Sequence, residues 1–255
     1  DSNAPGFDQQ QFGFAVGADV AVAEGLLLGL AGGYSDTDLD FDGGNDLEYE
    51  GFQVAAYGSF SPGPWYLDGM VSYAWYDHDS RRATIGGTAK GDYDSEVFTT
   101  YAETGYAFEI EQFTVTPFAG IGYAHADMDS FTESGAGAFN LSVDDTDAES
   151  LTSTLGVDFS ARLKMSWEVV LIPELRIGWE HEYLDDQQSV GVHFAGMPAS
   201  SYNVLSSEVA DDSAVVGAGF TVEMGEVWEL FLDYDGKLNE DYSQHAVSGG
   251  VKLTW

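Results

Sequence analysis

The last residues of the chain, 245–255, alternate between apolar side chains and polar or small ones. Successive side chains of a strand point to opposite faces, so this segment predicts a strand with one apolar and one polar face. It ends on Trp255, an aromatic residue of the kind that suits a membrane interface. Such a strand can belong to a transmembrane barrel or form the edge of a soluble sandwich, and the rest of the chain must decide between them.

The same alternation recurs along the chain and predicts eleven antiparallel strands. They are 11–22, 25–36, 49–61, 64–77, 96–109, 112–126, 150–164, 167–183, 212–224, 226–236 and 242–255. Each is about as long as the roughly 9–11 residues that cross a bilayer at a tilt.

Tight turns alternate with long loops between these strands. The turns lie near 24, 62, 111, 166 and 225, and the long loops are 36–47, 77–95, 126–149, 184–212 and 236–241. Short turns at one end and long loops at the other are typical of an outer-membrane barrel. The pattern therefore favours a transmembrane, antiparallel, up-and-down β-barrel over a sandwich.

The composition agrees with this fold class and excludes several functions. Glycine makes up 31 of the 255 residues and aromatic residues 14%, a pairing that fits close-packed strands with aromatic girdles. The chain has no cysteine, which excludes a disulfide framework, a thiol nucleophile and a thiolate metal site. The net charge of −36 excludes nucleic acid as a partner, because phosphate binding requires lysine and arginine.

Nothing in the chain marks a linker between two cores, so we expect residues 1–255 to form one barrel domain. Residues 1–10 are polar and turn-rich and are predicted to be a loop, and residues 11–255 the barrel. Bacterial single-chain barrels have even strand numbers. Residues 188–194 could supply a further strand, but they lie inside a long loop, where we predict a β-like excursion. The first strand of the barrel is then expected upstream of residue 1.

Several segments carry a family resemblance. They are 116–123, 130–143, 150–157, 173–182, 194–198, 212–219 and the terminal strand. In this order they resemble the translocator barrel of autotransporters. The resemblance implies a twelve-stranded antiparallel barrel in the outer membrane of a Gram-negative bacterium. It also implies the function, which is to anchor an upstream passenger and export it to the cell surface by type V secretion.

The resemblance also implies partners and an orientation. We expect contact with outer-membrane lipid and lipopolysaccharide, insertion by the barrel-assembly machinery, the chain's own upstream passenger as cargo, a monomeric barrel and a periplasmic C-terminus. Near that terminus one set of residues resembles the assembly signal of outer-membrane barrels. The set comprises Ser248, Gly250, Leu253 and Trp255.

The polar faces of the predicted strands are expected to line the barrel lumen. The lumen-lining candidates are Asp68, Glu103, Asp158, Arg162, Glu174, Arg176 and Glu180. Charges there are the ordinary solvated lining of a barrel. Glu174 and Arg176 lie two residues apart on one face, so we expect them to pair, together with Glu103. A lumenal acid that cleaves a passenger linker is the functional alternative, and no catalytic residue is predicted.

The sequence indicates neither a metal nor a cofactor. Asp38, Asp40 and Asp42 resemble the start of a calcium-binding EF-hand loop. The twelfth position of that loop, which requires a bidentate carboxylate, is Tyr49. A solvated acidic loop is therefore expected in this stretch.

Two other functions stay open. A free-standing outer-membrane pore would use the same fold without a passenger. A membrane-embedded hydrolase would need a nucleophile and a base clustered in the outer loops, and no such cluster is apparent. The translocator remains the leading hypothesis, and we expect no enzymatic activity from the barrel.

Overall fold

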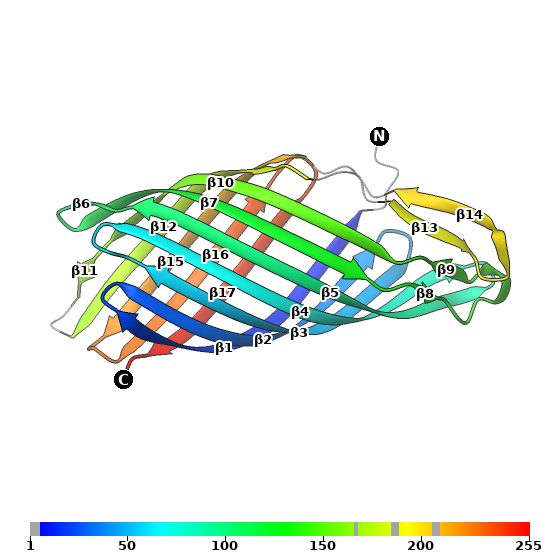
Figure 1. Cartoon of the computed structure of the whole chain (residues 1–255), viewed down its shortest axis with the longest axis horizontal. Coiled ribbons are helices and arrows are strands. Elements are labelled where there is room, and N and C mark those ends of the chain that lie inside the picture. Colours follow the sequence, from blue (N-terminus) through cyan, green and yellow to red (C-terminus); the bar gives the residue numbers. More distant parts are fainter. Residues whose placement is uncertain (1–5, 166–167, 185–188, 206–209) are drawn as a thin grey trace.

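The computed structural model describes residues 6–165, 168–184, 189–205 and 210–255. Its main sheet is an antiparallel meander whose main path has the predicted eleven strands (Figure 1). They are β1 (Phe7–Ala23), β2 (Leu26–Phe41), β3 (Asn45–Phe60), β4 (Trp65–Thr84), β5 (Gly87–Tyr106), β7 (Phe113–Met128), β10 (Thr146–Ala161), β12 (Val169–Glu182), β15 (Asp212–Met224), β16 (Trp228–Leu238) and β17 (Ser243–Leu253). Short β6 (Phe108–Ile110) and β11 (Leu163–Lys164) continue β5 and β10.

The sheet curls into a barrel wall (Figure 1). Each strand pairs with its neighbour along the chain, and among the described residues β1 and β17 end the order without pairing with each other. No helix in the described part is long and apolar enough to cross a membrane. The wall that the described residues form has two free edges, one at β1 and one at β17.

The alternation gives this wall an apolar face that is open to its surroundings. Leu30, Phe52 and Val71 lie on that face and are 69%, 64% and 47% exposed. Within the described residues, the buried apolar side chains are few: Ala74, Ala89, Phe118, Ala136 and Val192. Soluble proteins rarely expose a continuous apolar surface of this kind, so this face is built to lie in lipid.

Two aromatic girdles bound the apolar face. In β4 they are marked by Trp65 and Trp75, a separation that matches the roughly 9–11 residues of a tilted transmembrane strand. At the girdle of Trp75, ring N–H and O–H groups donate to carboxylates beyond it. The pairs are Tyr34–Glu50 at 2.6 Å, Tyr73–Glu96 at 2.5 Å, Tyr123–Glu149 at 2.6 Å and Trp179–Asp212 at 2.9 Å. An apolar ring with a polar tip suits this boundary between lipid and water.

The strands extend beyond the predicted ends. The loop predicted at 36–47 is mostly strand, with a turn only at 42–44, and the loop predicted at 77–95 is mostly the hairpin of β4 and β5. The acidic residues of these stretches alternate with Tyr, Leu and Ser, so backbone pairing continues past the membrane. The many acidic residues of these two stretches led to the prediction of loops, and that prediction was wrong for most of both stretches.

The prediction of a loop at 1–10 was wrong for residues 7–10, which belong to β1 and pair with 38–41 of β2. Residues 1–5 lie outside the described part. The stretch that resembles an EF-hand loop was expected to be a solvated acidic loop, but it is part of this ladder, since Asp38 and Asp40 lie in β2 opposite Glu48 and Asp46. An extended strand points these carboxylates outward and does not wrap them around a cation.

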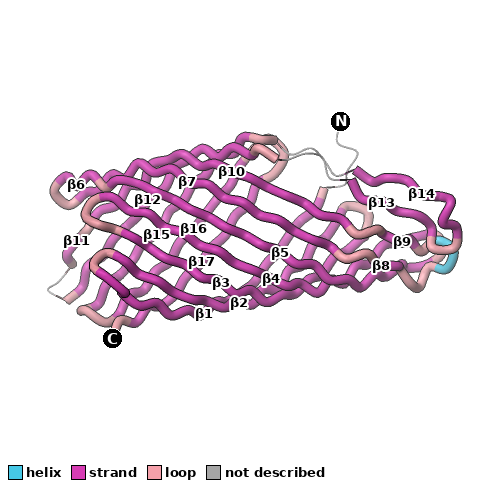
Figure 2. The backbone as a smooth tube through the Cα atoms, in the orientation of Figure 1, coloured by secondary structure: helices cyan, strands magenta, loops and turns pink. Residues whose placement is uncertain are grey.

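A second sheet forms at the hairpin end of the barrel, the end opposite the C-terminus (Figure 2). Its strands are β8 (Phe131–Thr132), β9 (Leu141–Val143), β13 (Ser189–Phe194) and β14 (Met197–Leu205), and a 3-10 turn η1 (Gly137–Phe139) lies between β8 and β9. The predicted excursion at 188–194 is confirmed for β13, which pairs with β14 and β9 and not with the barrel. Gln188, and Ser166 of the predicted turn near 166, lie outside the described residues.

Candidate functional site

The polar face of the wall is concave, as one contact across it demonstrates. Arg176 of β12 donates to the carboxylate of Glu103 in β5, although β7 and β10 lie between these strands in the sheet. Side chains can meet over two intervening strands only where the sheet curls toward them. The polar face is thus the barrel interior.

Glu103 is the centre of this interior cluster. The residue is 8% exposed, and its carboxylate accepts hydrogen bonds from the hydroxyls of Tyr66 at 2.8 Å and Tyr101 at 2.6 Å, besides the bond from Arg176. A buried carboxylate is tolerated when its charge is paired and its lone pairs are used. Glu103 meets both conditions.

Arg176 serves several partners at once. Its guanidinium carbon lies 3.7 Å from the centroid of the Phe118 ring, and Nη1 lies 3.7 Å from an oxygen of Asp158. The ring and the two carboxylates hold the guanidinium across the width of three strands. The cluster therefore stabilises the curvature of the wall and also neutralises carboxylate charge in the interior.

Glycines make room for the rings of this cluster. A Cβ added to Gly120 would lie 2.6 Å from the Tyr101 hydroxyl, and one added to Gly156 would lie 2.5 Å from the Phe118 ring. Both aromatic rings thus lie over strand positions where only glycine fits. This close approach accounts for part of the high glycine content.

The structure brings together some of the predicted lumen-lining residues and separates others. Arg176 pairs with Glu103 and Asp158, whereas Glu174 forms no ion pair in the described part of the chain. The expected pairing with Glu103 is thus confirmed for Arg176, whereas the expected Glu174–Arg176 pair was wrong. Asp68 lies directly opposite Glu103 in the register of β4 and β5.

The remaining two predicted residues lie at opposite ends of the interior. Glu180 pairs with Lys237 of β16 at 2.5 Å toward the hairpin end. Arg162 follows β10 at the turn end of the barrel, which is the end with the short turns and the C-terminus. It forms two hydrogen bonds with Glu223 of β15. Ion pairs are therefore spread along the full depth of the interior.

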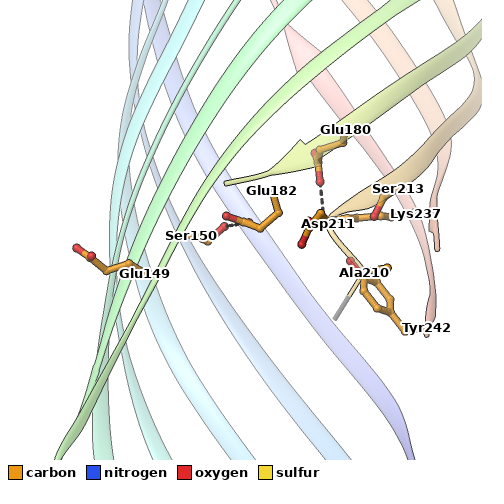
Figure 3. Close-up of a pocket in the computed structure, with 9 residues that line it drawn as sticks. All are labelled: Glu149, Ser150, Glu180, Glu182, Ala210, Asp211, Ser213, Lys237 and Tyr242. Carbon is orange, nitrogen blue, oxygen red and sulfur yellow. Dashed lines mark hydrogen bonds and ion pairs between the residues drawn. The ribbon is translucent and has the colours of Figure 1, made fainter. Parts of the chain in front are cut away.

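A cavity of about 260 Å³ lies at the hairpin end of the interior (Figure 3). Its lining consists of Glu149, Ser150, Glu180, Glu182, Ala210, Asp211, Ser213, Lys237 and Tyr242. The Glu182 carboxylate accepts from the Ser150 hydroxyl at 2.5 Å and from the amides of Leu151 at 2.8 Å and Leu184 at 3.0 Å. Sequence reasoning missed Glu182 and Lys237, although both continue the polar alternation of their strands. Within the described residues no group of His, Cys, Asp or Glu is arranged to hold a metal ion.

An antiparallel meander with an apolar outer face, aromatic girdles and a polar interior defines a transmembrane β-barrel of the outer-membrane type. The family of autotransporter β-domains matches residues 1–235, and the chain belongs to this family. The predicted fold class and the family resemblance are confirmed.

Two solved structures share the fold. The translocator domain of the autotransporter NalP from Neisseria meningitidis is 19% identical, with a TM-score of 0.80 over 97% of this chain and 82% of that one. The β-domain of the Bordetella autotransporter BrkA is 20% identical, with a TM-score of 0.74 over 98% of this chain and 92% of that one.

The similar curated proteins are much longer than this chain. An extracellular serine protease of Serratia marcescens is 27% identical over 99% of this chain, which covers 24% of that protein. Esterase EstA of Pseudomonas aeruginosa is 24% identical over 99% of this chain, which covers 40% of that protein. The chain is accordingly an outer-membrane translocator domain for an attached passenger, and the alternative of a free-standing pore is not favoured.

Proposed function

We propose that residues 1–255 act as one domain of a longer precursor and that the passenger leaves the cell along the concave face. The observation that carries this proposal is the polar, ion-paired interior beside an apolar outer face. Water can fill such an interior, so an unfolded polypeptide can keep its backbone solvated there. The hairpin end then faces the cell exterior, and the C-terminus faces the periplasm.

The test is surface display by the full-length precursor. With an epitope tag in the passenger, the tag should become accessible to antibody and protease on intact cells. The folded barrel is followed in the same cells by its heat-modifiable gel mobility. A passenger that stays in the periplasm beside a correctly folded barrel would contradict the proposal.

We also propose that the barrel itself is not an enzyme. The names of the Serratia and Pseudomonas proteins describe a protease and an esterase. This chain matches only a minor part of each, so we assign any such activity to the passenger. Purified barrel should hydrolyse neither peptide nor ester substrates.

In the described residues β1 and β17 each have one unpaired edge, and this observation favours a further strand between them. Unpaired backbone groups in hydrocarbon cost several kcal/mol each, by the general estimate. We propose that the segment preceding residue 1 in the precursor supplies this strand and completes a monomeric twelve-stranded ring. A disulfide between cysteines placed in that segment and in β17 should form in folded precursor, and its absence at every register would contradict the closure.

Assembly is proposed to depend on the end of β17. Leu253 lies opposite Trp228 in register, and Trp255 is 98% exposed, free to be recognised by the assembly machinery. Ser248 and Gly250 complete the proposed signal. Trp255→Ala should slow insertion into the lipopolysaccharide-containing membrane, measured as folded barrel per unit time after induction. An unchanged rate would remove Trp255 from the signal.

A further inference from the structure

The connection between β7 and β10 packs against the β4–β5 hairpin beyond the Trp75 girdle. Arg82 and Tyr93, which make these contacts, share a strand face with Asp68 and Glu103, so the contacts lie on the interior side of the hairpin. Anything that leaves the barrel along its interior therefore passes beside them. We call the contacts of Arg82, Glu133, Tyr93 and Phe131 the latch.

An ion pair forms the first half of the latch. Arg82 donates from Nε and Nη2 to the two oxygens of Glu133, at 3.0 and 2.6 Å, and from Nη2 to the carbonyl of Phe139 at 2.9 Å. The Glu133 side chain is only 7% exposed and also accepts from the amide of Leu141 at 2.6 Å. A bidentate pair with one buried partner fixes geometry as well as charge.

Ring stacking and backbone pairing form the second half. Phe131 stacks on Tyr93 with centroids 4.4 Å apart and planes 12° apart. The ring fits because residue 91 is glycine, where a Cβ would lie 2.4 Å from the Phe131 ring. Beside it, Lys90 and Ser134 exchange two backbone hydrogen bonds of 2.8 Å.

The latch also holds the connection between β12 and β15. Residues 141–143 of β9 pair with 192–194 of β13, so the β13–β14 hairpin is tied through β9 to the latch. β12 and β5 are separated in the barrel by β7 and β10. The second sheet therefore links two separated parts of the barrel rim at the hairpin end (Figures 1 and 2).

We propose that the second sheet is a strap across the outer mouth, and that the latch must open for the passenger to pass and closes again afterwards. This inference rests on the proposed translocator function. The contacts are few and lie outside the membrane, so they can open locally while the barrel wall stays folded. The ion pair and the ring stack then return the strap to one position.

The test locks the latch in the full-length precursor. Residues 1–255 contain no native cysteine, so Lys90→Cys with Ser134→Cys introduces a single possible disulfide within the barrel domain. Directly paired strand residues of this kind have Cα atoms about 5.5 Å apart, within disulfide range. With the disulfide formed, surface passenger should fall about tenfold or more, equivalent to about 1.4 kcal/mol, and dithiothreitol should restore it. Normal export with the disulfide intact would overturn the proposal.

The controls separate this result from a failure of the translocator function. The unsubstituted precursor should export its passenger, and failure there would count against the barrel as a conduit. Each single-cysteine precursor should also export normally, and a loss equal to that of the double variant would overturn the latch. Ala83→Cys with Thr88→Cys staples β4 to β5 and forms no covalent bond to the strap. This matched disulfide should leave export unchanged, and an equal block by it would also overturn the latch.

A second variant loosens the latch without crosslinking. Arg82→Gln removes the cation, and proteolysis between residues 133 and 141 in the folded barrel should accelerate about tenfold, again equivalent to about 1.4 kcal/mol. Arg81→Gln, which alters the exposed pair with Glu48 on the other face, is the control. Equal cleavage rates in both variants would contradict a closing role for Arg82.

Discussion

The charges of the interior and those of the outer face follow opposite rules. Inside, Glu103 is buried and holds a cation and two hydroxyl donors. On the outer face beyond the girdle, carboxylates lie directly opposite one another across four strands. These rows are Asp36–Glu50–Asp77–Asp94 and Asp38–Glu48–Asp79–Asp92. A buried charge requires a partner of opposite charge or hydrogen-bond donors. On the exposed face, water and salt ions screen the repulsion between neighbouring carboxylates.

The eight carboxylates of these two rows are part of the excess of acidic residues that gives the chain its net charge of −36. The rows lie on the same face as the lipid-exposed residues Phe52 and Val71, but past the Trp75 girdle. The chain therefore places apolar and acidic residues on one continuous strand face and separates them by depth. A carboxylate moved into the band between the girdles would lose its water.

The largest expected effect comes from removing the interior cation. Arg176→Met leaves the buried Glu103 charge uncompensated, which costs about 3–5 kcal/mol when one partner of a buried pair is lost. Denaturant unfolding of the barrel in lipid vesicles should show this loss of stability.

The exposed pair Arg81–Glu48, whose side chains are 46% and 47% exposed, supplies the control. Arg81→Met should change stability by about 0–1 kcal/mol. Adding Glu103→Gln to Arg176→Met should recover part of the loss because the orphaned charge is gone. Equal effects of the two arginine variants would contradict the comparison.

A smaller effect is expected in the acidic rows. A hydrogen bond with Asp92, partial burial and the charge of Asp92 raise the pKa of Asp79. The fold thus favours the protonated form of Asp79. The contribution of protonated Asp79 to folding stability is complete below the unfolded pKa and is lost as the pH rises through the folded pKa. At pH 7, Asp79→Asn should stabilise the hairpin by a few tenths of a kcal/mol after solvent screening.

Salt and pH distinguish this effect from a packing change. The gain from Asp79→Asn should shrink in high salt, which screens exposed charges. It should also vanish below the ordinary aspartate pKa of about 3.9. Hydrogen exchange of the β4–β5 hairpin measures both trends, and a gain independent of salt would refute the repulsion.

The smallest effect concerns His78, which lies on the interior side of the hairpin beyond the girdle. Its ring stacks on Tyr93 with centroids 4.6 Å apart, and Nε2 lies 2.8 Å from the Ser95 hydroxyl. Burial lowers the pKa of His78. Its stabilising contribution is complete above the unfolded pKa of about 6.5 and is lost as pH falls through the folded value. An NMR titration midpoint at or above that of the unfolded chain would contradict this.

Side-chain alternation was enough to predict the fold, the strand number and the turn end of the barrel. It failed at the hairpin end, where Asp38 and Asp79 looked like loop but continue strands past the membrane. Alternation assigns a face and does not reveal strand tilt or depth. It therefore wrongly favoured Glu174 as a partner of Arg176 beside the confirmed Glu103, and it could not show that Arg82 meets Glu133, which lies 51 residues further along the chain in another connection.

The most direct test of the account is which end of the barrel faces the cell exterior. In the precursor, whose residues 1–255 contain no native cysteine, Asp42→Cys and Ile85→Cys lie at hairpin tips, and Ile85 is 93% exposed. Pro62→Cys and Glu226→Cys lie in turns at the opposite end. A membrane-impermeant maleimide should label the first two on intact cells and the last two only after the outer membrane is permeabilised. Equal labelling of all four on intact cells would contradict the orientation and the proposed export path.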